Sequence, residues 1–135
     1  GRAWDVTVAP DWYRDYDKVA TLHYNRILEL SEKYDVPIGR SEGGEGVISY
    51  FPEDSVYKVF DALSTPPGTP KGYEAAAKAL LVATYTGYEI PVRFVTFSDA
   101  EAVEEKLDLA QEYNLKGAAF FSFNGEEDRD IWKLF

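Results

Sequence analysis

The chain has 135 residues, enough for one domain of ordinary size but too few for a complete eight-stranded α/β barrel of roughly 250 residues. Its hydrophobic fraction of 45% favours a packed core, and its net charge of −10 argues against nucleic acid or an anionic membrane surface as a partner. There is no cysteine, which excludes disulfides and thiolate sites, and no apolar run near the roughly 20 residues of a membrane span. The start at Gly1 and the lack of methionine suggest a processed chain, a tag remnant or an internal fragment.

The first half of the chain predicts a strand, a helix and a hairpin. Residues 3–8 alternate like a short strand, whereas residues 11–17 are aromatic and acidic, which is typical of a loop or a single turn. Thr21 can cap a helix that runs to about Tyr34. The glycine-rich segment 43–46 then turns the chain into an apolar extended run, which predicts a hairpin.

The middle of the chain is rich in turn residues and alanine. Residues 55–63 fit either a helix or an irregular arm, and residues 64–70 form a loop by their proline and glycine content. An alanine-rich helix is predicted from Tyr73 to about Tyr85, and Gly87 is placed to end it.

The last part of the chain predicts a strand, a capped helix and a second strand. Residues 90–97 alternate like a strand, and Ser98 with Glu101 predicts a capping box at the start of the next helix. We expect residues 90–97 and 117–123 to be neighbouring parallel strands, bridged by the helix from about Asp99 to Tyr113 in a right-handed crossover.

Motifs near both ends of the chain carry a family resemblance. Residues 97–103 read FSDAEAV, similar to a "FeDarSv" helix start, and residues 107–117 are similar to a "k…yglgG" approach to a strand. Residues 118–127 stand where "amfWsLdgDD" is typical, and residues 1–4 resemble "YGRaW" without its tyrosine. Together these segments resemble the C-terminal part of a family 18 glycoside hydrolase barrel, a family that includes chitinases and spore-cortex glycosidases.

The resemblance implies an α/β fold that is a partial (β/α)8-barrel segment with an α+β insertion. Residues 1–20 would be a barrel strand and cleft loop, residues 21–96 the insertion, and residues 97–135 the final helix–strand unit. In that case residues 117–123 could pair with residues 3–8 instead of 90–97. A stand-alone α+β domain is the alternative.

The resemblance also implies an extracellular or cell-surface protein that acts on or binds N-acetylglucosamine polymers, either chitin or peptidoglycan. The missing N-terminal part of the barrel, or another protein chain, would be a further partner. The family's catalytic signature DxxDxDxE does not occur in the sequence, and its last glutamic acid is the proton donor for a substrate-assisted reaction. We therefore expect this chain alone not to hydrolyse glycans.

Five residues form the predicted substrate-binding set. Trp4 offers a large apolar face to sugar C–H groups, and Arg2 can hold a sugar oxygen or an acidic neighbour. Phe121 stands in place of the family's tryptophan as a stacking platform. Asn124 stands in place of the family's aspartate, and with Asp15 it would hydrogen-bond sugar hydroxyls. The alternatives are core packing for the two aromatic residues and an ordinary surface loop around Asp15.

Other candidates favour structural roles. The acidic run 126–128 could be a pair of catalytic acids or a metal site, but a solvated turn at a helix N-terminus explains it better. His23 is the only histidine and lies on a predicted helix, so we predict no metal and no cofactor. Three functions stay open: a piece of a secreted glycosidase, a non-catalytic glycan-binding or assembly module, and an independent acidic interaction domain.

Overall fold

The computed structural model describes residues 1–10, 12–113 and 127–134. In chain order the elements are β1 (Arg2–Ala9), β2 (Trp12–Thr21), α1 (Tyr24–Lys33), β3 (Gly39–Arg40), β4 (Gly46–Tyr50), η1 (Val56–Ala62, a 3₁₀ helix), α2 (Glu74–Thr86), β5 (Ile90–Phe97), α3 (Ala100–Glu112) and η2 (Arg129–Leu134, a 3₁₀ helix).

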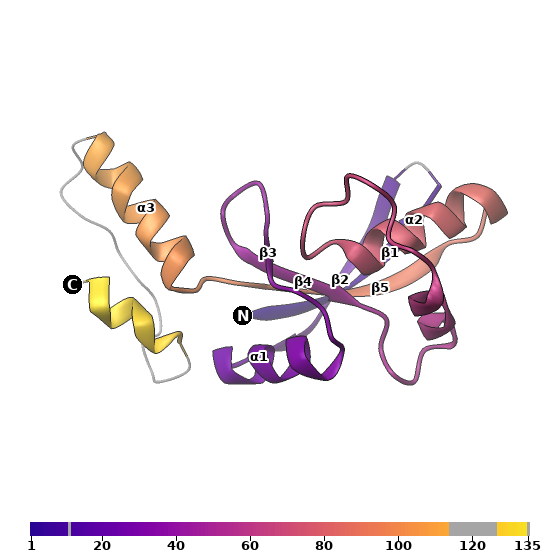
Figure 1. Ribbon diagram of the computed structural model, residues 1–135, viewed down its shortest axis with the longest axis horizontal. Helices are drawn as coiled ribbons and strands as arrows, with labels where there is room; N and C mark the ends of the chain where they lie inside the picture. The colour runs from indigo at the N-terminus through magenta and orange to yellow at the C-terminus, as the bar shows by residue number, and fades with distance from the viewer. Residues whose placement is uncertain (11, 114–126, 135) are drawn as a thin grey trace.

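A five-stranded sheet in the order β2-β1-β5-β4-β3 forms the centre of the molecule, and each neighbouring pair is antiparallel. Figure 1 shows α2 across one face of this sheet and α1 against the other, with α3 and η2 to one side beyond the end of β5. The described residues thus form a mixed α/β fold that fits the alternative of a stand-alone α+β domain. The partial barrel stays a prediction.

Alternation along the strands divides the core into two layers. On the α2 side, the core contains side chains of β1, β4, β5 and α2 and of Phe51, which follows β4; among the others are Val6, Val8, Val47, Ala76, Ala79, Ile90 and Val92. On the α1 side it contains Ala3, Ile27, Leu30, Ile48, Tyr50, Val95 and Phe97. Because successive strand residues point to opposite faces, one strand supplies both layers.

The predicted alanine-rich helix is confirmed as α2. Its buried face consists of Ala75, Ala76, Ala79 and Ala83, whose small side chains allow the helix to lie close to the sheet. Gly87 ends the helix in the left-handed conformation, with φ of 77°, as its position in the sequence predicts. Residues 55–63, left open between helix and arm, contain the short helix η1, and Ser55 caps it by accepting a hydrogen bond from the Tyr57 N–H.

The predicted hairpin is also confirmed, as β3 and β4. Its stem contacts the loop before α2 backbone to backbone: a Cβ added to Gly39 would lie 1.5 Å from the Lys71 carbonyl oxygen. Gly72 has φ of +95°, and a Cβ there would lie 2.5 Å from the Val47 carbonyl oxygen. Glycine at these two positions is therefore a condition for this packing.

Two predictions about the first half of the chain are wrong. Residues 12–17, predicted as a loop, belong to β2, which pairs with β1 along its length. An edge strand has only one paired side and accepts charged residues, so its sequence lacks the apolar alternation of an inner strand. Thr21 ends β2, opposite Arg2, and does not cap α1, whose N-cap is His23.

Two predictions about the second half also need correction. The N-cap of α3 is Asp99, whose side chain accepts a hydrogen bond from the Ala102 N–H at 3.0 Å, and not Ser98. Serine and aspartate can both act as N-caps, and Asp99 takes this position because it is buried against the guanidinium of Arg40. Over residues 93–96, β5 is paired with β1 on one side and β4 on the other, which leaves no free edge there for a parallel partner. That predicted partner, residues 117–123, lies outside the described residues.

Candidate functional site

A groove of about 970 Å³ opens between the sheet, the N-terminal half of α2 and the β3–β4 hairpin. β1 and β5 form its floor, α2 forms one wall, and the turn of the hairpin forms the other. The loop before α2 closes one end with Thr69 and Pro70.

Three aromatic side chains, Trp4, Phe94 and Tyr73, line the groove together with aliphatic side chains of the sheet and of α2. Trp4 and Phe94 are opposite each other on β1 and β5. The rings of Tyr73 and Phe94 are tilted, with centroids 5.8 Å apart. Trp4 is half-buried, and its indole Nε1–H donates a long hydrogen bond to Thr96 Oγ1 at 3.4 Å, which favours this orientation of the ring. Burial, assisted by the charge of Glu42, raises the pKa of the Tyr73 hydroxyl above its usual value.

Polar groups surround this aromatic surface. Arg40, Ser41 and Glu42 come from the hairpin, and Thr96 comes from the end of β5. Thr69 donates its hydroxyl proton to the Pro66 carbonyl at 2.6 Å, which holds the closing loop in one conformation. A concave aromatic surface with a few placed polar groups is the usual composition of a site for a small polar ligand.

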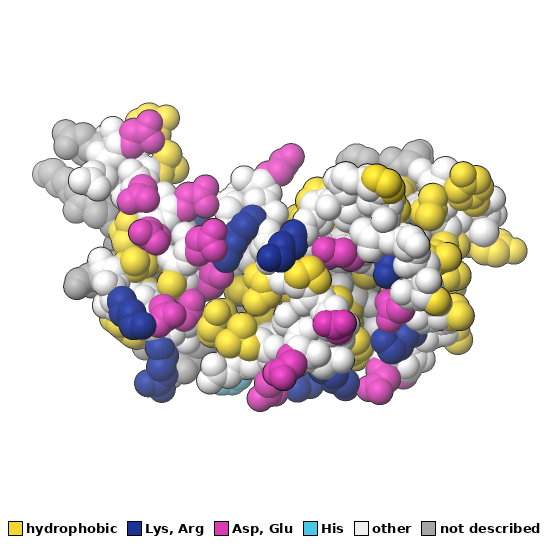
Figure 2. Space-filling model, in the orientation of Figure 1, with side chains coloured by type: hydrophobic (Ala, Val, Ile, Leu, Met, Phe, Trp, Pro, Cys, Tyr) yellow, Lys and Arg dark blue, Asp and Glu magenta, His cyan; other side chains and the backbone are white. Residues whose placement is uncertain are grey.

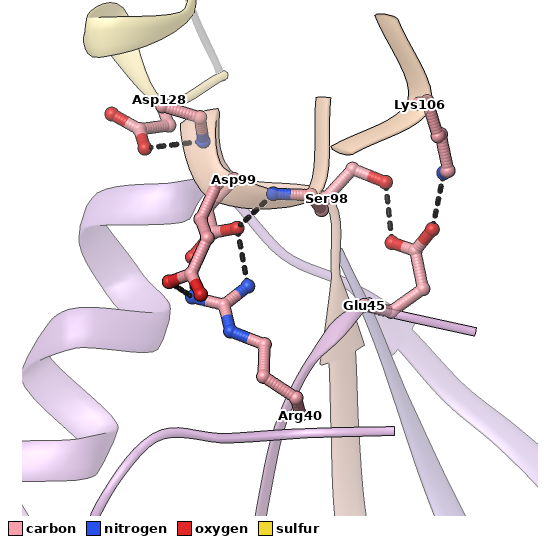
Figure 3. Close-up of polar contacts among 9 residues, drawn as sticks. Arg40, Glu45, Ser98, Asp99, Lys106 and Asp128 are labelled. Atoms are coloured by element: carbon pink, nitrogen blue, oxygen red, sulfur yellow. Dashed lines mark hydrogen bonds and ion pairs between the residues drawn. The ribbon is translucent and has the colours of Figure 1, made fainter. Parts of the chain in front are cut away.

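The positive charge of Arg40 is paired with carboxylates of the protein itself. Its guanidinium donates to both carboxylate oxygens of Asp99, at 2.6 and 2.7 Å, and also to Glu101 at 2.7 Å (Figure 3). Burial acts to raise the pKa of Asp99, but the hydrogen bonds from Arg40 and from the Ala102 N–H outweigh it and hold the pKa below its usual value. Since two carboxylates surround one guanidinium, this side of the groove does not offer an unpaired positive charge.

A second hollow of about 500 Å³ lies at the end of the sheet and contains Arg2. Tyr24, Glu45 and Ser98 line it as well, and Thr96 is shared with the groove. The structure therefore separates Arg2 from Trp4, although the two are close in sequence. The side chain of Asp15 is not described, and Phe121 and Asn124 lie outside the described residues, so the part predicted for these three residues in sugar binding stays a prediction.

Sequence analysis did not identify Tyr73, Phe94 and Arg40 as site residues. Both aromatic residues fit the apolar pattern of their elements, which is the pattern of a core. Arg40 forms an ion pair with Asp99, which is 59 residues away in the sequence, and no local motif predicts a pair over that separation. The one available signal for Arg40 is its place directly before a glycine-rich turn, where side chains of a hairpin reach a rim.

The acidic run 126–128 has a structural role where it is described. Asp128 Oδ2 accepts the Ala100 N–H at 2.8 Å, and Oδ1 accepts the Asp130 N–H at 3.0 Å, so Asp128 caps the first turns of α3 and η2. Asp128 is buried, in contrast to the predicted solvated turn. Glu127 accepts the Trp132 indole N–H at 3.2 Å. Glu126 lies outside the described residues.

The described lining of the groove contains few groups that could act in acid–base chemistry. Among the described residues, Glu42 is the one carboxylate that lines it, whereas glycoside hydrolysis commonly needs a positioned acid and a second group across the scissile bond. Within the same part of the chain, no three histidine, aspartate or glutamate side chains are arranged to hold a metal ion. None of the described helices has the length and apolar character needed to cross a membrane.

Comparison with family models, curated protein sequences and solved structures gives no match for this chain. The resemblance to family 18 glycoside hydrolases stays a prediction from sequence motifs. Function is therefore inferred from the groove.

Proposed function

We propose that this chain binds an N-acetylglucosamine-containing glycan in the groove, with Trp4 as the stacking surface, and does not hydrolyse it. The observation that carries the proposal is the position of Trp4, which lines the groove beside Phe94 with its indole oriented by Thr96. A pyranose has an apolar C–H face and a rim of hydroxyls, so it is complementary to an aromatic surface bordered by polar side chains.

The electrostatics of the groove favour an uncharged sugar. The chain carries a net charge of −10, Glu42 lines the hairpin wall, and Arg40 is paired with Asp99 and Glu101. Arg40 is the one cation among the described residues that line the groove and it is already paired, so an anionic ligand would meet this negative field with little to offset it. N-acetylglucosamine is neutral, and its amide can exchange hydrogen bonds with Ser41 and Thr96.

Titration with N-acetylglucosamine oligomers tests the proposal. We expect saturable amide and indole shifts at Trp4, Ala77 and Thr96 in an NMR experiment. Trp4→Leu should weaken binding about tenfold, equivalent to roughly 1.4 kcal/mol, because the stacking surface is lost. Trp132→Leu is the matched control, since Trp132 is exposed on η2, away from the groove, and its replacement should leave affinity unchanged. Absence of any response at millimolar oligomer, with the variants folded, would refute glycan binding.

A second candidate is a protein-interaction module, and one observation favours it. Val56 and Val59 of η1 and Tyr85 and Tyr88 near the end of α2 are each more than two-thirds exposed. Figure 2 shows hydrophobic side chains gathered over that end of the molecule. This candidate predicts that a second copy or another chain covers these residues. Sedimentation of the chain and of Val59→Asp would show it as self-association that the variant loses.

A further inference from the structure

The turn of the β3–β4 hairpin lies between the groove and α3: one side of the turn lines the groove, and the other side faces α3. Arg40, Ser41, Glu42 and Gly43 all line the groove. The turn itself is closed by a hydrogen bond from the Ser41 N–H to the Glu45 carbonyl at 2.9 Å, which joins the two ends of residues 41–45. Its position decides how wide the groove is at this side.

Charged groups of α3 and of the segment before it hold the outer side of the turn. Arg40 is held by Asp99 and Glu101, as described above. Glu45 accepts hydrogen bonds from the Ser98 hydroxyl and from Lys106 (Figure 3). The contact is close, since a Cβ added to Gly44 would lie 2.5 Å from Glu105 Oε2. These contacts place α3 directly against the back of the groove wall.

The stem of the hairpin is held in a different way. Gly39 and Gly72 bring the backbones of β3 and the loop before α2 together, and that packing involves no charge. Backbone packing is insensitive to salt, whereas partly exposed ion pairs weaken as salt screens them. The stem is thus fixed at Gly39 by packing, whereas its last residue, Arg40, and the turn that follows are held by charge.

We infer that α3 is an electrostatic clamp on the groove, which holds the hairpin turn in its ligand-binding position through Arg40 and Glu45. The consequence of this clamp is that glycan affinity depends on the position of α3, and that consequence rests on the proposed function. A wall that is held in place before binding costs less to order when the ligand arrives. Release of α3 therefore lowers affinity, and rising salt does the same to a smaller extent.

Asp99→Asn tests the clamp cleanly, because asparagine still caps the helix but no longer carries the charge that pairs with Arg40. Asp108→Asn is the matched control: it is the same substitution on an exposed position of α3. The sequence contains no cysteine, so Leu109→Cys in α3 and Tyr85→Cys in α2 allow spin labels at two exposed sites only.

We expect Asp99→Asn to broaden the distance distribution between the labels, to speed amide exchange at residues 41–44 and to weaken glycan binding about fivefold. Asp108→Asn should change none of the three. Arg40→Gln combined with Asp99→Asn should broaden the distances no further than Arg40→Gln alone, since loss of the guanidinium already breaks the pair with Asp99 as well as the pair with Glu101. Unchanged distances and exchange in Asp99→Asn would overturn the clamp. Altered distances with unchanged glycan affinity would overturn its control of the groove.

Failure of the proposed function would look different from failure of the clamp. If the unaltered chain binds no glycan oligomer, the proposed function is refuted. The label distances and the exchange of the turn amides still decide whether α3 holds the turn.

Discussion

Replacement of Gly39 by alanine should destabilise the protein far more than the same change at Gly43, four positions along the same hairpin. The added Cβ at Gly39 would lie 1.5 Å from the Lys71 carbonyl oxygen, whereas ordinary van der Waals contact begins at 3.4 Å. The carbonyl would have to retreat by about 2 Å in a close-packed interior. It has no room to do so, because Gly72 beside it already lies against Val47.

We expect Gly39→Ala to lower the free energy of unfolding by about 3 kcal/mol, the upper range for an overpacked core. At Gly43 a Cβ would meet only Ser41 Oγ, at 3.9 Å, and the backbone there is not left-handed. Alanine at Gly43 should therefore be neutral or stabilise by up to about 0.5 kcal/mol, because it restricts the unfolded chain. Urea unfolding followed by circular dichroism measures both variants. Free energies of unfolding within about 1 kcal/mol of each other would refute the close packing of hairpin and loop.

The remaining predictions concern a buried hydroxyl, a carboxylate and activity. Ser49 is fully buried, and among the described residues its hydroxyl is the buried side-chain group without a hydrogen-bond partner. Ser49→Ala should therefore raise the free energy of unfolding by about 1 kcal/mol in a urea titration. A loss of stability in this variant would show that the hydroxyl has a partner. The pKa of Asp99 is lowered in the folded state, so its stabilising contribution is complete above the ordinary carboxylate pKa of about 3.9 and is lost as pH falls through the folded value. The stability difference between the unaltered chain and Asp99→Asn should thus be present at pH 7 and shrink below about pH 4, and a difference independent of pH would contradict this assignment. Incubation of the chain with chitin oligomers should give no products above background by mass spectrometry. The sequence lacks the expected proton donor, and general acid assistance contributes about 10²–10⁴-fold to the rate. Turnover that is abolished by Glu127→Gln would prove this prediction wrong.

Elements with strong local signals could be predicted from the sequence. Residues 90–97 alternate in the way that an inner strand requires, and β5 has these bounds. Alanine spacing and Gly87 located α2 to within a residue at each end. In these cases the structure depends on burial of one face or on a left-handed residue at a helix end. Both produce a residue pattern that can be recognised within a few positions of the sequence.

Features that depend on distant partners could not be predicted. β2 is a strand because β1 offers it a free edge, and nothing in its own aromatic and acidic residues requires this. The choice of Asp99 over Ser98 as N-cap depends on Arg40, which is remote in sequence. The same holds for the groove, which is lined by side chains of the sheet, of a hairpin turn and of a helix that lie far apart in the sequence.

Trp4 illustrates why a choice between core residue and binding residue could not be made from the sequence. The side chain packs against the core on the α2 side of the sheet and also lines the groove. These two roles support each other, because packing of one side of the ring against the core, with the Nε1–H directed at Thr96, restricts its rotation away from a ligand. A rigid platform loses little conformational entropy on binding, and that reduces the cost of association. Burial of one side of the ring is therefore an argument for its role as a sugar-binding surface on the other.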